Sequence, residues 1–211
     1  MKVLNLYSGI GGNRKLWQDV EVTAVENNES IAKVYQDYFP EDKMIIGDAH
    51  QYLLDHFKEF NFIWSSPPCP THSRIRINFQ DAKGGNKRAP VYPNMSLYQE
   101  IIFLGGFFKG QYCVENVKPY YTPLIPAVEI ERHLFWSNFK LNPQKQKTSD
   151  KILRGSIEER YKIKGFDVSD KKGINKERVI NNCVRPETGL YILNCARNII
   201  TKSTHQTALE L

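Results

Sequence analysis

The sequence lacks any apolar run long enough to form a membrane-spanning helix. None of its 211 residues lies in a stretch that approaches the ~18 consecutive apolar residues of a bilayer span. The first residues, Met1 to Leu6, also lack the long apolar region and cleavage site of a secretory signal. We therefore expect an intracellular, cytoplasmic protein with no membrane partner.

Cysteine is scarce, and the cysteines present have no paired spacing. Cys69, Cys113, Cys183 and Cys195 are scattered along the chain, which argues against a disulfide framework or a zinc knuckle. His72 follows Cys69 by three residues, but this pair supplies only half of a tetrahedral metal site. We therefore expect no bound metal.

Positive charge is only in mild excess over negative charge. A formal net charge of +6 and a pI near 9.0 favour approach to a polyanion, but charge alone does not identify nucleic acid as the ligand. Hydrophobic residues make up 41% and charged residues 25% of the chain, as in ordinary globular proteins. The length suits one core domain with a small appendage, and no internal repeat is present.

Short apolar runs alternate with helix-like segments, which is typical of an α/β protein. The runs predict buried strands at Val3 to Tyr7, Val22 to Val25, Met44 to Ile46, Phe62 to Trp64, Tyr112 to Val114 and His133 to Trp136. The segments between the first runs predict helices at Asn13 to Asp19, Ser30 to Tyr38 and Gln51 to Phe57, and Pro186 opens a final helix. This alternation predicts a mixed, mostly parallel sheet with helices on both faces.

A glycine-rich turn follows the first predicted strand, in the run Leu4 to Gly12. Glycine lets a ligand approach the backbone, and free N–H groups there bind polar ligand atoms. Glu26 ends the second strand, where its carboxylate can accept from ribose hydroxyls, and Asp48 ends the third, near an adenine amino group. Together these features favour a nucleoside cofactor over a structural turn, and NAD remains open at this point.

Two reactive groups follow the fourth and fifth predicted strands. Cys69 lies in the proline-rich run Ser65 to Pro70, and Glu115 lies at the end of the fifth strand. A free cysteine is usually a small buried hydrophobe, and a strand-end glutamate is usually an ion-pair partner. At one sheet edge, however, the two make a nucleophile and a general acid.

The order of these motifs resembles that of the cytosine-5 DNA methyltransferase family over nearly the whole chain. The motifs are the glycine turn, Glu26, Asp48, Pro67-Pro68-Cys69, Glu115-Asn116-Val117, Glu131-Arg132-His133 and Asn182-Cys183-Val184. The run Arg132 to Phe139 is most similar to short phage-encoded members. The resemblance implies a class I S-adenosylmethionine-dependent methyltransferase (Rossmann-like) fold.

The resemblance also assigns roles residue by residue. Cys69 is expected to be the nucleophile, Glu115 the acid at cytosine N3, and Arg132 a contact to the target base. The residues expected to hold S-adenosylmethionine are Tyr7, Ser8, Gly9, Ile10, Gly11, Gly12, Glu26, Asn27, Asp48, Ala49, Pro68, Asn182, Cys183 and Val184. Two positions depart from the family pattern: Pro70 replaces the usual glutamine, and Ile130 replaces the first of two arginines.

The resemblance further divides the chain and names its partner, double-stranded DNA. We expect a catalytic and cofactor-binding core at 1–139, a reduced target-recognition segment at 140–164, and a return to the core at 165–211. Basic side chains expected to contact DNA are Arg74, Arg76, Lys83, Lys87, Arg88, Lys145, Lys147 and Arg154. So short a recognition segment predicts a site of about two to four base pairs, or a separate recognition subunit.

Three rival functions remain open on sequence. An RNA (tRNA) cytosine-5 methyltransferase would share Cys69 and Glu115 and differ in substrate. A non-catalytic DNA-binding protein would retain the fold. A dinucleotide oxidoreductase would share the glycine turn and the strand-end acids.

Overall fold

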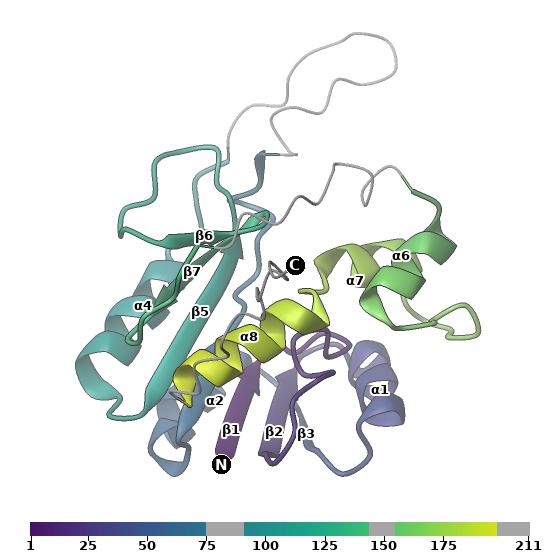
Figure 1. Cartoon of the computed structure of the whole chain (residues 1–211), viewed down its shortest axis with the longest axis horizontal. Helices are drawn as coiled ribbons and strands as arrows, with labels where there is room; N and C mark the ends of the chain where they lie inside the picture. The colour runs from purple at the N-terminus through teal and green to yellow at the C-terminus, as the bar shows by residue number, and fades with distance from the viewer. Residues whose placement is uncertain (75–90, 144–154, 198–211) are drawn as a thin grey trace, which may run out of the picture.

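The computed structural model describes residues 1–74, 91–143 and 155–197, and the strands of these ranges form one seven-stranded sheet (Figure 1). In sequence order the strands are β1 Lys2–Leu6, β2 Glu21–Glu26, β3 Lys43–Ile46, β4 Phe62–Ser65, β5 Gln111–Val117, β6 Val128–Ile130 and β7 His133–Ser137. The spatial order is β3-β2-β1-β4-β5-β7-β6, parallel from β3 to β5, with β7 antiparallel to both of its neighbours. The predicted mixed, mostly parallel sheet is confirmed, whereas the short edge strand β6 was not predicted.

Helices connect the parallel strands and cover both faces of the sheet. They are α1 Glu29–Tyr38, α2 Ala49–His56, α4 Ser96–Phe107, α6 Ile157–Lys164, α7 Lys176–Asn182 and α8 Pro186–Ala196, with a 3-10 turn η1 at Phe57–Glu59. Several begin at a polar cap: the side chains of Asn28 and Asp48 each accept a backbone N–H of the first helical turn. The predicted helices that correspond to α1, α2 and α8 are confirmed.

Alternate side chains of the strands pack into two apolar layers. Leu4 and Leu6 of β1 point into a cluster with α2 and α4, whereas Val3 points into a cluster with α8. Figure 1 shows α8 running across one face of the sheet. Burial on both faces explains why the strands read as continuous apolar runs.

The predicted helix at Asn13 to Asp19 is wrong, because this segment forms a series of turns. The Arg14 guanidinium donates to the carbonyl of Trp17 at 2.8 Å and pairs with Asp42 at 2.8 Å, which fixes a non-helical path. The space beside this segment is occupied by α8. The Trp17 indole donates to the carbonyl of Gly189 in that helix at 3.0 Å.

The chain after 155 forms a small helical unit beside α1. Ser156 caps α6 with a reciprocal capping box, and Gly165 ends it in the left-handed conformation. Phe166 then packs on Tyr38 with ring centroids 4.8 Å apart. Apolar side chains of this unit, including those of α7, form a third apolar cluster with α1.

A substitution at Gly189 tests whether the close contact between α8 and Asn13, directly after the glycine turn, is essential for stability. A Cβ at Gly189 would lie 2.1 Å from the backbone oxygen of Asn13. We expect Gly189→Ala to destabilise the fold by about 1–3 kcal/mol through overpacking, although alanine is the better helix former. The free energy of unfolding in urea measures the effect.

Gly106 in α4 is the matched control. A Cβ there would meet nothing within 4 Å, so Gly106→Ala should stabilise the protein by about 0.5–1 kcal/mol. A gain in stability from both substitutions would contradict the packing described here.

Candidate active site

The turn after β1 has a backbone that favours glycine and leaves room for a ligand. Tyr7, Gly9 and Gly11 have φ angles of +55°, +55° and +84°, which side chains rarely adopt. No heavy atom lies within 4 Å of a Cβ built on Gly9. The hydroxyl of Ser8 is buried and has no hydrogen-bond partner within the described part of the chain. An open backbone beside an unpartnered donor fits the polar part of a nucleoside cofactor.

Two carboxylates stand at the same sheet edge as this turn. Glu26 ends β2, is 9% exposed, and accepts from the N–H groups of Gly9 at 3.1 Å and Asn28 at 3.0 Å. Asp48 does not end β3 as predicted, because β3 stops at Ile46. Asp48 instead caps α2, is exposed, and accepts from Gln51 N at 2.8 Å. Both carboxylates border the glycine turn, and the other early cofactor candidates divide into buried Ile10 and Ala49 and exposed Asn27 and Pro68.

The late segment reaches the glycine turn. A Cβ on Gly12 would lie 2.6 Å from the carbonyl oxygen of Val184 and 2.8 Å from the Cβ of Cys183. Asn182 is the last residue of α7 and is exposed. Gly12 of the early candidates therefore packs directly against Cys183 and Val184 of the late ones.

Cys69 lies on a tight turn that follows β4. Its carbonyl accepts from the N–H groups of His72 at 3.0 Å and Ser73 at 3.1 Å. The side chain of Asn116 in β5 donates to the carbonyl of Pro67 at 2.9 Å. The asparagine of the Glu-Asn-Val run thus fixes the turn relative to the strand that carries Glu115.

Glu115 is 7% exposed and has few hydrogen-bond donors around it. Ser66 donates to its carboxylate, and the Trp64 indole donates to the Ser66 hydroxyl at 2.8 Å. His133 Nε2 lies 3.6 Å from Glu115 Oε1. Burial, Arg132 and Lys164 keep the pKa of His133 well below its ordinary value, so this is a close approach of a neutral ring rather than an ion pair.

Burial sets the protonation of the two reactive groups. It raises the pKa of Glu115 to about 7, against the opposing effects of the Ser66 hydrogen bond, Arg132 and Lys164. Burial and then the Glu115 charge raise the pKa of the Cys69 thiol, opposed by Arg132 and Arg178. A proton on Glu115 therefore removes one of the two causes that hold Cys69 as a thiol.

Arg132 joins this site to the C-terminal part of the chain. Its guanidinium donates to the carbonyl of Asn181 in α7. Lys164, which is 3% exposed, donates to the carbonyl of Cys183 at 2.6 Å. Burial and then Arg132 lower the pKa of Lys164 to about 8. Two cations thus meet the carbonyl end of α7, where the helix dipole favours positive charge.

Of the predicted DNA contacts, the structure describes Arg74 alone. Arg74 is exposed, and its Nε donates to the carbonyl of Pro119 at 2.8 Å. The others, Arg76, Lys83, Lys87, Arg88, Lys145, Lys147 and Arg154, lie outside the described residues. Their role stays a prediction.

Sequence reasoning assigned no role to four polar residues of this region: Ser66, Glu100, His133 and Lys164. Ser66 and His133 lie inside the runs Ser65 to Pro70 and Glu131-Arg132-His133, so their positions carried a signal. Glu100 and Lys164 lie in helices far from any motif. Their burial depends on partners that only the fold identifies.

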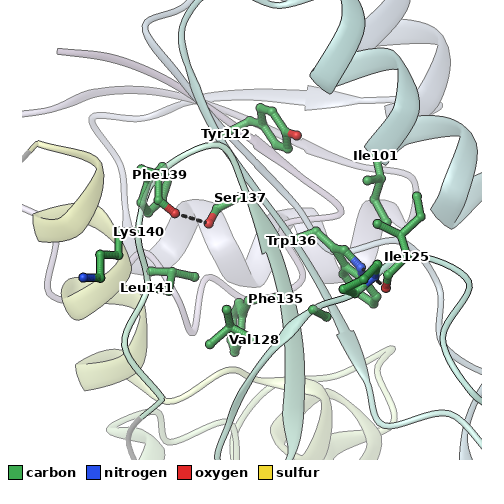
Figure 2. Close-up of a pocket in the computed structure, with 12 residues that line it drawn as sticks. Ile101, Tyr112, Ile125, Val128, Phe135, Trp136, Ser137, Phe139, Lys140 and Leu141 are labelled. Carbon is green, nitrogen blue, oxygen red and sulfur yellow. Dashed lines mark hydrogen bonds between the residues drawn. The ribbon is translucent and has the colours of Figure 1, made fainter.

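An apolar hollow of about 390 Å³ lies away from these residues, between α4, β5, β6 and β7 (Figure 2). Ile101, Tyr112 and Trp136 line it, and no predicted catalytic residue does. Within the described ranges, no three His, Cys, Asp or Glu side chains are grouped to hold a metal ion. In the same ranges, no helix has the length and apolar character to cross a membrane.

Comparison with known proteins finds one family model that matches part of the chain. Residues 1–88 match the family model of the C-5 cytosine-specific DNA methylases. The chain is 35% identical over 80 residues to a tRNA (cytosine(38)-C(5))-methyltransferase of Spodoptera frugiperda, and 32% identical over 84 residues to one of Mus musculus. These alignments cover 35% and 36% of this chain but only 24% and 20% of the relatives.

A solved structure resembles the whole fold. The Entamoeba histolytica methyltransferase EhMeth superposes with a TM-score of 0.55 over 96% of this chain and 99% of that chain, at 11% identity. So low an identity supports the methyltransferase fold and no finer conclusion. The predicted fold class is thereby confirmed.

The raised pKa of Glu115 makes a prediction about stability. The folded protein holds the Glu115 proton more tightly than the unfolded chain does. The contribution of this proton to the free energy of unfolding is therefore complete below pH 4.5 and is lost as the pH rises to about 7. Glu115→Gln mimics the protonated acid. We expect it to be more stable than the parent by about 3 kcal/mol at pH 8 and nearly equal to it at pH 4.5.

Urea unfolding at the two pH values measures this difference. Glu21→Gln, an exposed position at the start of β2, is the control and should show no such pH dependence. Equal behaviour of the two variants would show that Glu115 is charged in the folded protein at neutral pH.

Proposed function

We propose that this chain methylates carbon 5 of cytosine in DNA, because its residues 1–88 match the family model of the C-5 cytosine-specific DNA methylases. The observation that carries the proposal is the placement of Cys69 and Glu115 at adjacent strand ends, beside the glycine turn. S-adenosylmethionine is the methyl donor that the family and fold imply. Bound there, it supplies an electrophilic methyl group on a positively charged sulfur.

Cytosine carbon 5 is a weak nucleophile until a group adds to carbon 6. The Cys69 thiolate forms that carbon–sulfur bond, which pushes electron density toward carbon 5. Glu115 in its protonated form donates at N3 and stabilises the developing negative charge. After carbon 5 has taken the methyl group, its proton leaves to a base or water, and the sulfur of Cys69 departs as the ring double bond returns.

Charge complementarity supports this order of events. Protonated Glu115 both donates to the ring and ceases to oppose ionisation of Cys69. Arg132 and Arg178 favour the thiolate from the other side. The target base must leave the duplex stack to reach this edge, so base flipping belongs to the proposal.

A tRNA cytosine is the second candidate substrate. It is favoured by the names of the two matched relatives, both tRNA (cytosine(38)-C(5))-methyltransferases. The matched part of the chain spans only 24% and 20% of the length of these relatives. The chemistry at Cys69 and Glu115 is the same for both polymers.

A mechanism-based trap tests both the nucleophile and the substrate. Fluorine cannot leave carbon 5 as a proton does, so 5-fluorocytosine should hold the protein in a covalent adduct when S-adenosylmethionine is present. We expect a denaturant-stable adduct with duplex DNA and none with Cys69→Ser. Cys195→Ser, in α8 away from the site, is the matched control and should form the adduct as the parent does.

The two substrate arms give distinct outcomes. An adduct with 5-fluorocytosine tRNA and not with DNA would replace the DNA proposal by the RNA one. An undiminished adduct in Cys69→Ser would overturn the assignment of the nucleophile for both polymers.

The cofactor pocket is tested by binding of S-adenosylhomocysteine. Glu26→Ala removes an acceptor at the end of β2 and should weaken binding by about 1–3 kcal/mol. Glu21→Ala lies at the opposite end of the same strand and should leave affinity unchanged. Isothermal titration calorimetry measures both, and equal affinities for the two variants would place the cofactor elsewhere.

A further inference from the structure

A fully buried carboxylate connects three segments of the proposed site. Glu100 of α4 is 0% exposed. Its Oε1 accepts from the Tyr7 hydroxyl at 2.6 Å and lies 3.0 Å from His50 Nδ1, and its Oε2 accepts from the Ser65 hydroxyl at 2.5 Å. The partners come from the end of β1, the first turn of α2 and the end of β4.

Each partner adjoins a segment with an assigned role. Tyr7 begins the glycine turn, His50 follows Asp48 by two residues, and Ser65 is the first residue of the run that carries Cys69. Glu100 itself has no access to substrate because it is completely buried. Any effect it has on the reaction therefore passes through these neighbours.

The energetics of burial make these contacts strong. A carboxylate out of water is costly unless donors surround it, so loss of any one donor is felt. Tyr7 also has a φ of +55°, a strained conformation for a residue with a side chain. Its hydroxyl bond to Glu100 secures the far end of the side chain and so supports this backbone. Burial and Glu100 raise the pKa of Tyr7, which keeps the hydroxyl protonated as a donor.

We propose that Glu100 is a positioning residue that couples the cofactor pocket to the catalytic loop, by holding Tyr7 and Ser65 on the two oxygens of one carboxylate. This inference rests on the proposed function, because it assumes that the glycine turn binds S-adenosylmethionine. Displacing Ser65 then alters the turn at Tyr7 through Glu100, although the two residues lie on different strands. His50 connects the start of α2, next to Asp48, to the same carboxylate.

A double-mutant cycle measures this coupling. Tyr7→Phe and Ser65→Ala each remove one hydroxyl, and calorimetry with S-adenosylhomocysteine gives the affinity of the parent, both single variants and the double variant. Because both hydroxyls act on one carboxylate, we expect the combined loss of affinity to differ from the product of the single losses by about threefold or more. When the cycle is repeated in a Glu100→Leu background, the combined loss of affinity should equal the product of the two single losses.

Conservative replacement separates positioning from simple packing. Glu100→Leu should weaken S-adenosylhomocysteine binding by about tenfold. Glu100→Gln keeps the shape and one acceptor and should restore most of that loss. Gln99→Leu, at the exposed neighbouring position of α4, is the matched control and should bind as the parent does.

The outcomes distinguish this inference from the proposed function. No binding of S-adenosylhomocysteine to the parent chain would overturn the proposed function. Normal binding by the parent, together with a multiplicative Tyr7–Ser65 cycle, would overturn the role of Glu100 alone. If Glu100→Leu does not fold, the cycle in the parent background decides the question by itself.

Discussion

The parallel pairing of β1 with both β2 and β4 is the constraint on which the site depends. Leu6 pairs with Val25 on one side and with Ser65 on the other. Because the three strands run in one direction at matched register, their chains leave the sheet at one edge. The glycine turn, Glu26 and the turn that carries Cys69 therefore lie at one edge, although Gly9 and Cys69 are 60 positions apart in sequence. Strands ending out of register would separate Cys69 from the glycine turn.

Three buried glutamates stand near this edge, and the donors around each one suit a different task. Glu26 accepts from two backbone N–H groups, which hold it as an acceptor at the glycine turn. Glu100 accepts from two hydroxyls beside a histidine and binds protein segments together. Glu115 has the Ser66 hydroxyl and a neutral His133, so burial raises its pKa to about 7. Sparse donors and burial thus leave Glu115 with a raised pKa.

The sequence predicted the parts of the fold that local pattern determines. Continuous apolar runs identified the parallel strands, and the helix-like segments between them identified the helices that follow β2 and β3. It failed where distant contacts decide the outcome. Asn13 to Asp19 has a helical composition, but α8 fills the space beside it and Arg14 fixes turns. Glu100 resembles any polar residue of an amphipathic helix, since its three partners lie between 35 and 93 positions away.

The C-terminal segment completes a site that the N-terminal motifs only begin. Gly12 has no room for a side chain because Val184 and Cys183 pack against it, so tertiary packing requires the glycine. Arg132 and Lys164 are held by the carbonyl groups of Asn181 and Cys183, and the same two cations act on Glu115. The family match ends at residue 88, yet the electrostatics of Glu115 depend on Lys164 of α6 and on Arg132, which is held by α7. Changes in this small helical unit would therefore alter the chemistry at Glu115 without touching the glycine turn's own sequence.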